Sequence, residues 1–343
     1  MTIAITPMTG RDTESWDNFV RSAPDGTFFH LSGWSRIFPA VFGHTVHYLQ
    51  AMRGSELVGV LPLVHQNSRL FGNALMAAPF LVEGGPLAAD DEAKAALDKA
   101  AIALKERVGA KYIEFRSRTA SRADWRARKG LYATFKRALS PNDEENLLAI
   151  PRKQRAVVRK TLSAGLMSVV DANVDRFFRV YSESVRNLGT PVFSKRYFGM
   201  LLDVFPGDSD IVVILDGGRP VSAVLNFYFG DTVLPYYGGG ISDARKSGAN
   251  DFLYWEVMRR AAARGYTQFD FGRSKAETGA FKFKKNWGFE PNWLEYEYFL
   301  DDGRVLPEKN PNNPKYQLAI EAWKRLPLPV ANFLGPFLVP GLG

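Results

Sequence analysis

The sequence predicts an α/β (α+β) protein built from two tandem domains of one type. The chain has 343 residues, a length that suits two domains of ordinary size. A content of 46% hydrophobic and 23% charged residues is typical of a globular protein. Both halves show the same predicted order of helix, hairpin, strand, helix and strand. We therefore divide the chain into residues 1–140, residues 141–300 and a C-terminal extension at 301–343.

The elements of the first half are predicted from turn residues and helical periodicity. Residues 53–56, Arg-Gly-Ser-Glu, form a tight turn, so the strands on either side of it make a hairpin. Residues 91–108 place apolar and charged side chains on opposite faces of a helix, which Gly109 ends. The expected elements are helices at 16–21, 34–42 and 91–108 and strands at 44–52, 57–64, 75–82 and 111–116.

The second half follows the same plan. Residues 216–219, Asp-Gly-Gly-Arg, join the two strands of a hairpin, and Gly265 ends a helix at the C′ position. In the extension, residues 316–325 are expected to form a short helix, and residues 333–343 are apolar with Gly and Pro throughout. The other expected elements are a basic helix at 151–164 that leads into 174–187, a helix at 250–264, and strands at 210–215, 220–229, 232–238, 268–271 and 294–300.

Composition argues against several kinds of site. The chain has no cysteine, which removes disulfides and thiolate nucleophiles together. All four histidines lie in the first fifth of the chain, and we interpret them as strand and loop residues. We therefore expect no metal site and no Ser-His-Asp triad. We find neither a secretory signal nor a stretch of about 20 apolar residues, so we expect a cytoplasmic protein.

The first group of candidate site residues lies between a strand and a helix. Tyr236 and Tyr237 precede three consecutive glycines, and residues 245–250 lead into the next helix. A glycine-rich turn before a helix N-terminus presents backbone N–H groups that suit a phosphate. An ordinary strand-to-helix turn with a solvated basic pair remains the alternative. The residues that we assign to donor binding are Arg245, Lys246, Gly248, Ala249 and Asn250.

The second group lies around a strand end that carries a carboxylate. Asp270 stands between two phenylalanines, where a carboxylate must be paired or exposed, and Arg273 is its expected partner. If the following segment is helical, Phe283 and Trp287 fall on one face and Lys284 flanks that face. The alternative reading of these side chains is aromatic core packing with a fringe of solvated lysines.

The third group is a run of cations at residues 151–160, which contains no acidic residue. Proline suits the first position of a helix, so the run is expected to be helical. Arg152, Arg155 and Arg159 then fall within one narrow arc. Three guanidinium groups on one face can hold a diphosphate or a sugar phosphate bidentately. A solvated cationic face is the alternative.

Several of these segments resemble a known family. Residues 269–291 read FDFGRSKAETGAFKFKKNWGFEP and follow a helix that ends in AAARGY. This run resembles the FemAB-like aminoacyl- and peptidyltransferases, and most closely the FemAB-related proteins of exosortase (PEP-CTERM) and exopolysaccharide systems. Residues 28–44, 71–87 and 323–336 look like the same subfamily. Because those proteins are members of the GNAT superfamily, the resemblance implies two tandem GNAT-like domains, each a mixed, mostly antiparallel sheet flanked by helices.

The resemblance also implies roles for single residues. In FemAB-like enzymes a Phe-Lys pair lines the acceptor site, and it matches Phe283 and Lys284. The lysine would stabilise the oxyanion that forms on the acyl carbonyl, and we assign Asp270 as the base. Residues 245–250 match the pyrophosphate turn of GNAT enzymes, although Asn250 stands where their pattern has glycine or alanine. The residues assigned to substrate binding are Phe283, Arg273, Trp287, Tyr236, Tyr237, Arg152, Arg155 and Arg159.

We therefore expect an acyl- or aminoacyltransferase that acts on an amine or hydroxyl of an envelope-glycan, exopolysaccharide or peptidoglycan-precursor acceptor. No tightly bound cofactor is expected, because acyl-CoA or aminoacyl-tRNA would serve as co-substrate. The net charge of +8 suits either phosphate-bearing donor, and we expect no DNA partner. A non-catalytic binding module for an anionic glycan carrier is the alternative. The tail at 316–343 can pack on a domain or lie on the inner face of the inner membrane, and both readings stay open.

Overall fold

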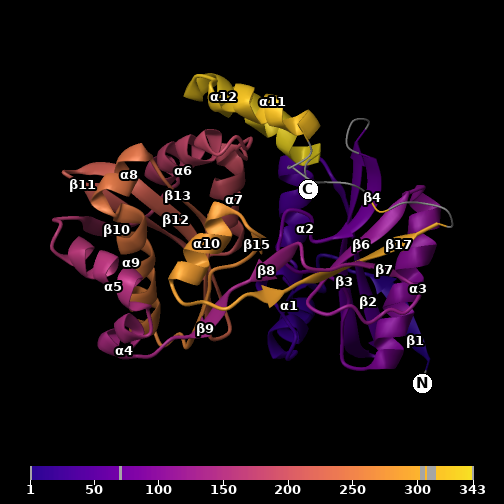
Figure 1. The fold of residues 1–343 in the computed structure, drawn as a ribbon. Coiled ribbons are helices and arrows are strands. Elements are labelled where there is room, and N and C mark those ends of the chain that lie inside the picture. The colour runs from indigo at the N-terminus through magenta and orange to yellow at the C-terminus, as the bar shows by residue number, and fades with distance from the viewer. Residues whose placement is uncertain (1, 69–71, 302–305, 307–313, 342–343) are drawn as a thin grey trace. The chain divides into compact units, whose positions relative to one another are not determined.

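The computed structural model describes residues 2–68, 72–301, 306 and 314–341, and it contains two compact units (Figure 1). The first unit comprises Met1–Tyr132, Trp293–Glu308 and Pro340–Gly343, and the second comprises Ala133–Asn292 and Lys309–Val339. The expected division at residues 140 and 300 therefore differs from the observed one. The end of the expected second domain belongs to the first unit, and most of the expected extension belongs to the second.

The first unit is built on a mixed sheet whose strand order is β1-β2-β3-β4-β6-β17-β7, with β5 beside β3. Only β4 and β6 pair in parallel; the other pairs are antiparallel. The predicted hairpin is β2 and β3. The strands are β1 (Ile3–Pro7), β2 (Thr45–Arg53), β3 (Glu56–Ser68), β4 (Gly72–Ala77), β5 (Leu87–Ala88), β6 (Tyr112–Ser117), β7 (Arg126–Arg128) and β17 (Glu295–Leu300).

The helices of this unit are α1 (Thr13–Ser22), α2 (Trp34–Ile37) and α3 (Asp91–Val108). Helix α3 has the predicted ends, because the Asp90 side chain accepts a hydrogen bond from the Ala93 N–H and Gly109 is left-handed. Its Leu97 packs into the core with Leu61 and Phe115. The expected strand at 75–82 ends early, at Ala77, because the chain turns at Ala78 and Phe80, which both have positive φ.

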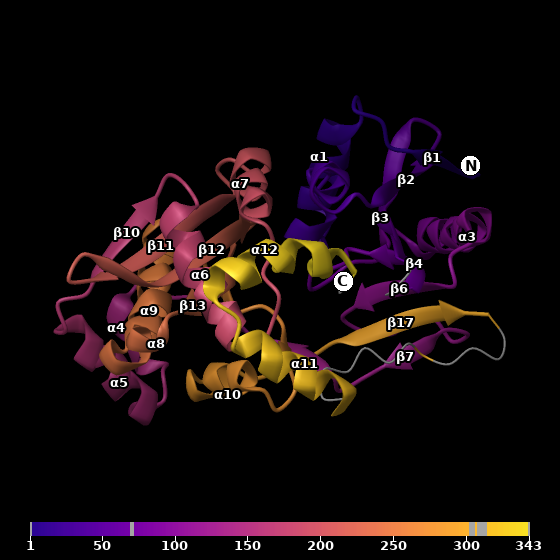
Figure 2. The same cartoon turned by 90° about the horizontal axis from the view of Figure 1, so that it is seen from above.

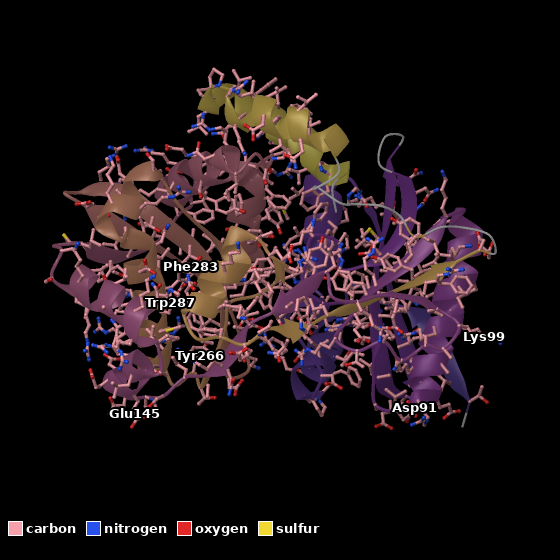
Figure 3. The ribbon with its side chains drawn as sticks, viewed as in Figure 1. Asp91, Lys99, Glu145, Tyr266, Phe283 and Trp287 are labelled. Atoms are coloured by element: carbon pink, nitrogen blue, oxygen red, sulfur yellow. The ribbon has the colours of Figure 1, made fainter. Side chains whose placement is uncertain are left out.

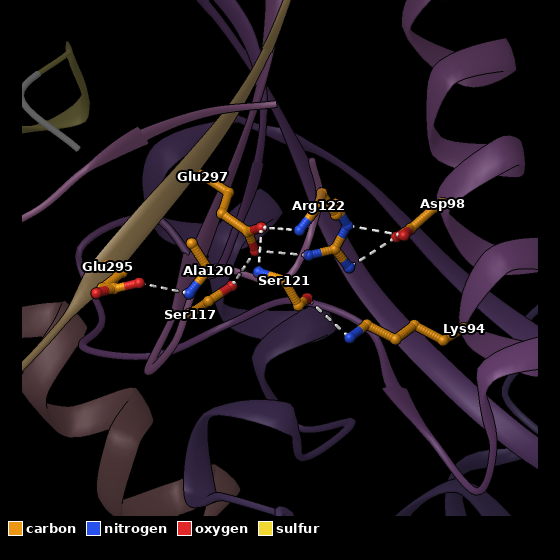
Figure 4. Close-up of polar contacts among 8 residues, drawn as sticks. All are labelled: Lys94, Asp98, Ser117, Ala120, Ser121, Arg122, Glu295 and Glu297. Atoms are coloured by element: carbon orange, nitrogen blue, oxygen red, sulfur yellow. Dashed lines mark hydrogen bonds and ion pairs between the residues drawn. The ribbon is translucent and has the colours of Figure 1, made fainter. Parts of the chain in front are cut away.

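Strand β17 corrects the prediction that residues 294–300 end the second domain. It pairs with β6 on one side and β7 on the other. The Glu297 side chain is fully buried there and accepts hydrogen bonds from Ser117 Oγ at 2.8 Å and Arg122 Nη1 at 2.6 Å (Figure 4). Arg122 also forms two contacts with Asp98 of α3, at 2.7 and 2.8 Å. This network fixes a late segment of the sequence in a sheet formed by the early ones.

The second unit has a six-stranded sheet in the order β10-β11-β12-β13-β14-β9. Only β13 and β14 are parallel. Its strands are β9 (Lys136–Ala138), β10 (Met167–Asp171), β11 (Ser209–Asp216), β12 (Arg219–Phe229), β13 (Thr232–Gly240) and β14 (Gln268–Asp270). Its helices are α4 (Asp143–Leu148), α5 (Arg152–Leu162), α6 (Asp175–Asn187), α7 (Lys195–Val204), α8 (Ser242–Ser247), α9 (Ala249–Ala263) and α10 (Gly279–Asn286). Three short strands form a further sheet in the order β15-β8-β16. They are β8 (Tyr132–Thr134), β15 (Ser274–Lys275) and β16 (Asn292–Trp293).

Both units repeat one plan, as predicted: three antiparallel strands, a helix, and a strand parallel to the third. The plan comprises β2, β3, β4, α3 and β6 in the first unit and β11, β12, β13, α9 and β14 in the second. In each sheet, the strand that lies beside the last strand of this plan comes from a distant part of the sequence. Strand β17 lies beside β6, and the earlier strand β9 lies beside β14. The two repeats have therefore exchanged a strand.

Gly238, Gly239 and Gly240 form the end of strand β13 and not the turn that we expected. A Cβ at Gly238 would come within 2.6 Å of Tyr254 Oη, and one at Gly239 within 2.6 Å of Ser184 Oγ. These contacts come from α9 and α6 respectively, so the two helices cover opposite faces of the strand. The glycines are required here because side chains of both helices pack directly against the strand backbone.

The C-terminal segment forms two helices, α11 (Pro314–Lys324) and α12 (Leu328–Leu338), both in contact with α6 (Figures 1 and 2). The first matches the expected short helix at 316–325. The second lies where only an apolar segment rich in Gly and Pro was expected; residues 342–343 of that segment lie outside the described residues. Within the described part of the chain, no helix has the length and apolarity to span a bilayer.

Candidate functional site

The parallel strands of the second unit separate after a short pairing. Their register contains only two pairs, Thr232 with Gln268 and Val233 with Phe269. Strand β13 then continues to Gly240, with a bulge opposite Leu225 and Asn226, whereas β14 ends at Asp270. A bulge bends its strand, and ligands of α/β proteins bind beyond the carboxyl ends of parallel strands. These strand ends therefore locate the candidate site.

The corresponding position in the first unit is closed by the protein's own backbone. Strands β4 and β6 also share only two parallel pairs. Beyond them, the N–H and carbonyl of Gly84 exchange hydrogen bonds with those of Arg116, at 3.0 and 2.6 Å. In the second unit, where residues 133–292 are all described, no isolated bridge fills the equivalent position. The second unit is therefore the better candidate for a donor site, in agreement with the sequence analysis.

Lys284 lies in helix α10 and is buried, with 8% of its surface exposed. Its Nζ donates hydrogen bonds to the carbonyl oxygens of Gly272 at 2.9 Å and Arg273 at 3.2 Å. It also lies 5.4 Å from the centre of the Phe135 ring. Burial lowers the pKa of Lys284 to about 7, although the charge of Asp270 partly opposes this shift. The ammonium thus has one N–H left and a pKa near neutrality.

Asp270 and Arg273 both lie in the segment that Lys284 holds. Asp270 Oδ1 accepts a hydrogen bond of 2.7 Å from the Gly272 N–H, which fixes the turn after β14. Both side chains are partly exposed, and each has further interactions. The two charges act on Lys284 in opposite directions, because Asp270 raises its pKa and Arg273 lowers it. The structure thus places the predicted base and the predicted oxyanion-stabilising residue in one cluster.

The segment with the Phe-Lys pair is helical, which meets the condition under which Phe283 and Trp287 were expected to share one face. The ring of Phe283 on α10 and the ring of Trp287, directly after the helix, have their centres 6.0 Å apart. Figure 3 labels both residues. Phe283 is half-buried and contacts Tyr254 of α9 at 5.5 Å. Trp287 is fully buried, so it belongs to the core. The prediction that Trp287 contacts substrate directly is not compatible with this burial.

The rings of Tyr236 and Tyr237 lie together at the bulge of β13, with their centres 4.8 Å apart. Tyr237 is buried, and its hydroxyl shares a hydrogen bond of 2.7 Å with that of Tyr197 on α7. Burial raises the pKa of Tyr237 well above its ordinary value. This residue therefore packs in the core, and its assignment to substrate binding stays a prediction. Tyr236 is half-buried beside Phe227, at the bulge of β13.

The donor-binding segment has a different shape from the predicted turn. Arg245 and Lys246 are exposed in the last turn of the short helix α8, and Lys246 pairs with Asp243 at 3.2 Å. Gly248 has a φ of +73°, and a Cβ there would lie 2.7 Å from Thr161 Cγ2 of α5. Ala249 is buried. The Asn250 side chain accepts a hydrogen bond of 2.6 Å from Ser222 Oγ and packs on Gly240, so it is directed at the sheet.

The three predicted arginines lie on helix α5. Arg152 and Arg159 are exposed and Arg155 is half-buried. Arg159 forms an ion pair of 3.0 Å with Glu144, although both side chains are more than half exposed. The opposite face of α5 carries Val158 and Thr161, which are buried. The structure therefore places the arginines on one outer face and brings α5 against the start of α9.

A half-buried carboxylate that the sequence analysis missed connects all three groups. Asp251, in the first turn of α9, accepts hydrogen bonds from Gln154 Nε2 of α5 at 2.6 Å and from Trp287 Nε1 at 3.1 Å. Burial raises the pKa of Asp251, because the two neutral donors offset only part of the lost hydration. In the sequence, the only sign of this role is that Asp251 follows Gly248 and falls in the first turn of α9. The basic helix, the donor segment and the Phe-Lys helix meet at Asp251.

We expect the substitution Asp251→Asn to stabilise the fold at pH 8 and to lose this advantage at low pH. The raised pKa means that the folded state holds a proton more tightly than the unfolded state, whose reference value is 3.8. Wild-type stability therefore falls as pH rises from that value through the folded pKa and is constant above it. The variant has no such titration. Urea unfolding of both proteins at pH 4 and pH 8 would measure the difference, and an equal difference at both pH values would contradict the expectation.

A metal does not fit this site. Among the residues that the structure describes, no group of three or more His, Cys, Asp or Glu side chains is arranged to hold an ion. The charged side chains of the site are instead a lysine with two carbonyl partners and a carboxylate with two neutral donors. This arrangement can polarise a carbonyl or move a proton.

Known proteins resemble the chain in both sequence and fold. Residues 151–285 match the model of the acetyltransferase (GNAT) domain family. No curated protein matches. Among solved structures, FemX has a TM-score of 0.69 at 18% identity, over 92% of this chain and 100% of its own.

Two further structures share the fold. A tandem GNAT protein from the clavulanic acid biosynthesis pathway has a TM-score of 0.56 at 13% identity, over 88% of this chain and 100% of its own. The C-terminal domain named for lysylphosphatidylglycerol synthetase, from Agrobacterium fabrum, has a TM-score of 0.55 at 16% identity, over 85% of this chain and 92% of its own. Residues 151–285 of the second unit therefore match a GNAT acetyltransferase domain, and the chain shares its fold with FemX and with the tandem GNAT protein.

Proposed function

We propose that this protein transfers an acyl or aminoacyl group to an amine or hydroxyl of an envelope-glycan, exopolysaccharide or peptidoglycan-precursor acceptor. The observation that carries the proposal is the match of residues 151–285 to the GNAT domain, because this segment includes Asp270, Phe283 and Lys284. The strand separation at β13 and β14 supports it, since a donor can reach the site at those strand ends. The envelope-related acceptor is suggested by the resemblance of residues 269–291 to FemAB-like enzymes, and the fold shared with FemX is consistent with it.

In the proposed reaction the acceptor nucleophile attacks the donor carbonyl, and the donor thiolate or tRNA hydroxyl leaves. The acceptor loses a proton and the leaving group gains one. The remaining N–H of Lys284 would stabilise the oxyanion, and Asp270 would accept the proton of the nucleophile. Phe283, which is half-buried beside Tyr254, would contact the acceptor. Arg152, Arg155, Arg159 and Arg273 would bind its phosphate groups.

The donor can be tested with acyl-CoA thioesters and with charged tRNA. For acyl-CoA, we expect the double variant Arg245→Ala/Lys246→Ala to raise KM about tenfold with little change in kcat. The two exposed cations would bind phosphate equally in the ground state and the transition state, and tenfold corresponds to about 1.4 kcal/mol. Thiol release and product mass would be measured.

A matched control for the donor test is Lys99→Ala/Lys111→Ala, which removes the same charge from exposed positions of the first unit. We expect this variant to retain the wild-type KM. An equal rise in KM for both double variants would assign the effect to net charge alone. Transfer from charged tRNA without turnover of any acyl-CoA would select the other donor.

The alternative function, a non-catalytic module that binds an anionic glycan carrier, has one observation in its favour. Asn250 departs from the GNAT pattern, and its side chain packs on Gly240 at the start of α9. If neither donor yields product while the protein binds a lipid-linked saccharide phosphate in equilibrium dialysis, the binding function replaces the enzymatic one.

A further inference from the structure

Helix α12 has two chemically different faces. The inner face consists of small residues, since Ala331 and Gly335 are buried. A Cβ at Gly335 would lie 2.7 Å from the carbonyl oxygen of Val192, so the helix backbone packs directly on this segment. Asn332 Nδ2 donates a hydrogen bond of 3.3 Å to Ser182 Oγ of α6. These contacts hold α12 in one orientation on the second unit.

The outer face of α12 is apolar and open to solvent. Its two phenylalanines are the most exposed, Phe333 at 68% and Phe337 at 72%, and their ring centres lie 5.6 Å apart. Val330, Leu334 and Leu338 extend the same surface, each more than a third exposed. The helix contains no charged residue. Figure 2 shows α12 at the surface above α6.

Cations border this outer face. Arg325 is exposed in the short turn between α11 and α12. On α6, Arg179 is exposed one turn before Ser182, which contacts α12, and Arg186 donates a hydrogen bond of 2.9 Å to the Leu326 carbonyl. The nearby carboxylate Glu321 is already paired with Lys324 at 2.6 Å. The three arginines outnumber Glu183, the carboxylate that follows Ser182 on α6, so the border carries a net positive charge.

We propose that the outer face of α12 docks on the surface of an anionic lipid bilayer. An apolar helix face with flanking cations lies in the plane of the interface, with its aromatic residues below the headgroups and its cations among them. A second copy of the chain fits the same face less well. A two-fold interface would place the Arg179 and Arg325 side chains of both copies around one apolar contact, where like charges repel.

The test uses the full chain and sedimentation with vesicles. Binding to vesicles of mixed phosphatidylglycerol and phosphatidylcholine is compared with binding to pure phosphatidylcholine. We expect the anionic vesicles to bind at least about tenfold more tightly, since several cations contribute. The double variant Phe333→Ser/Phe337→Ser is expected to lose at least about tenfold in binding to the anionic vesicles. Because both rings are exposed, the variant should keep its circular dichroism and its Tm.

A control variant removes two exposed apolar side chains elsewhere on the second unit. Leu148 and Leu162, on α4 and α5, are 54% and 48% exposed, so Leu148→Ser/Leu162→Ser should bind vesicles like the wild type. A Phe337→Trp variant should gain fluorescence that brominated lipids quench.

Three results would overturn the proposal: absence of vesicle binding by the wild type, equal loss in the control variant, or a Phe337→Trp variant whose added fluorescence brominated lipids leave unquenched. A dimer in solution that Phe333→Ser/Phe337→Ser dissociates, without vesicle binding, would assign the face to a second copy. The test needs no transferase activity, so its outcome is independent of the proposed function.

Discussion

Replacing Lys284 with alanine is expected to lower kcat for acyl transfer by about 10²–10³-fold, as for loss of one preorganised oxyanion donor. The ammonium is held by the carbonyl oxygens of Gly272 and Arg273 and is shielded from water, so its remaining N–H is fixed before the reaction begins. Since the charge develops only in the transition state, kcat should fall more than KM rises. Steady-state kinetics with the active donor would measure this.

The pH profile distinguishes this role from a purely structural one. Because the pKa of Lys284 is about 7, the charged fraction decreases as pH rises through that value. If the cation stabilises the oxyanion, kcat of the wild type should decline above pH 7. A kcat that instead rises through pH 7 and then stays constant would show that the neutral amine acts, as a base.

Two further variants control for folding. Lys284→Met keeps the aliphatic volume beside Phe135 but not the charge, so it should lose activity while retaining a Tm near the wild-type value. Lys285→Ala removes a neighbouring lysine that is exposed, and it should leave kcat unchanged. Full activity of Lys284→Met would refute the assigned role.

The substitution Glu297→Ala is expected to destabilise the first unit by about 3–5 kcal/mol, because it removes one partner of a buried ion pair. Arg122 would keep Asp98 but lose the contact of 2.6 Å to Glu297. The backbone N–H groups of Ser121 and Arg122, which donate to Glu297 at 2.8 and 2.9 Å, would lose their acceptor. Strand β17 would thus lose its main polar attachment.

Urea unfolding followed by tryptophan fluorescence would test this expectation, with the transition of the first unit moving to lower urea. Lys129→Ala is the matched control: its pair with Glu295 has side-chain exposures of 63% and 23%, so its loss should cost less than about 1 kcal/mol. Comparable destabilisation by the two variants would mean that the buried network adds nothing beyond a surface pair.

Elements defined by local sequence were predicted well. The signals that start and end helix α3, the cap at Asp90 and the glycine at Gly109, are part of the same short stretch of sequence as the helix. The β2–β3 hairpin likewise depends on a turn of four residues. The spacing of Phe283 and Trp287 suits the helix α10 that the structure contains, although the sequence analysis left that helix as a condition. Each of these elements is determined by residues close together in the sequence, so it can be predicted without knowing which distant residues pack against it.

Features that depend on distant residues were missed. Three consecutive glycines suggest a turn, and only the approach of Ser184 and Tyr254 shows why a strand needs them. Asp251 looks like an ordinary acidic residue of a helix N-terminus until Gln154 and Trp287 are placed beside it. Similarly, nothing within residues 295–300 reveals that their partner is β6.

The strand exchange has a consequence for synthesis on the ribosome. All six strands of the second unit's sheet lie between residues 136 and 270, so that sheet can form as soon as this stretch has emerged. The sheet of the first unit must wait, because β7 is joined to β6 only through β17. The sheet of the N-terminal unit is therefore completed after the sheet of the C-terminal unit, and until β17 emerges the β6 edge stays unpaired and open to non-native pairing.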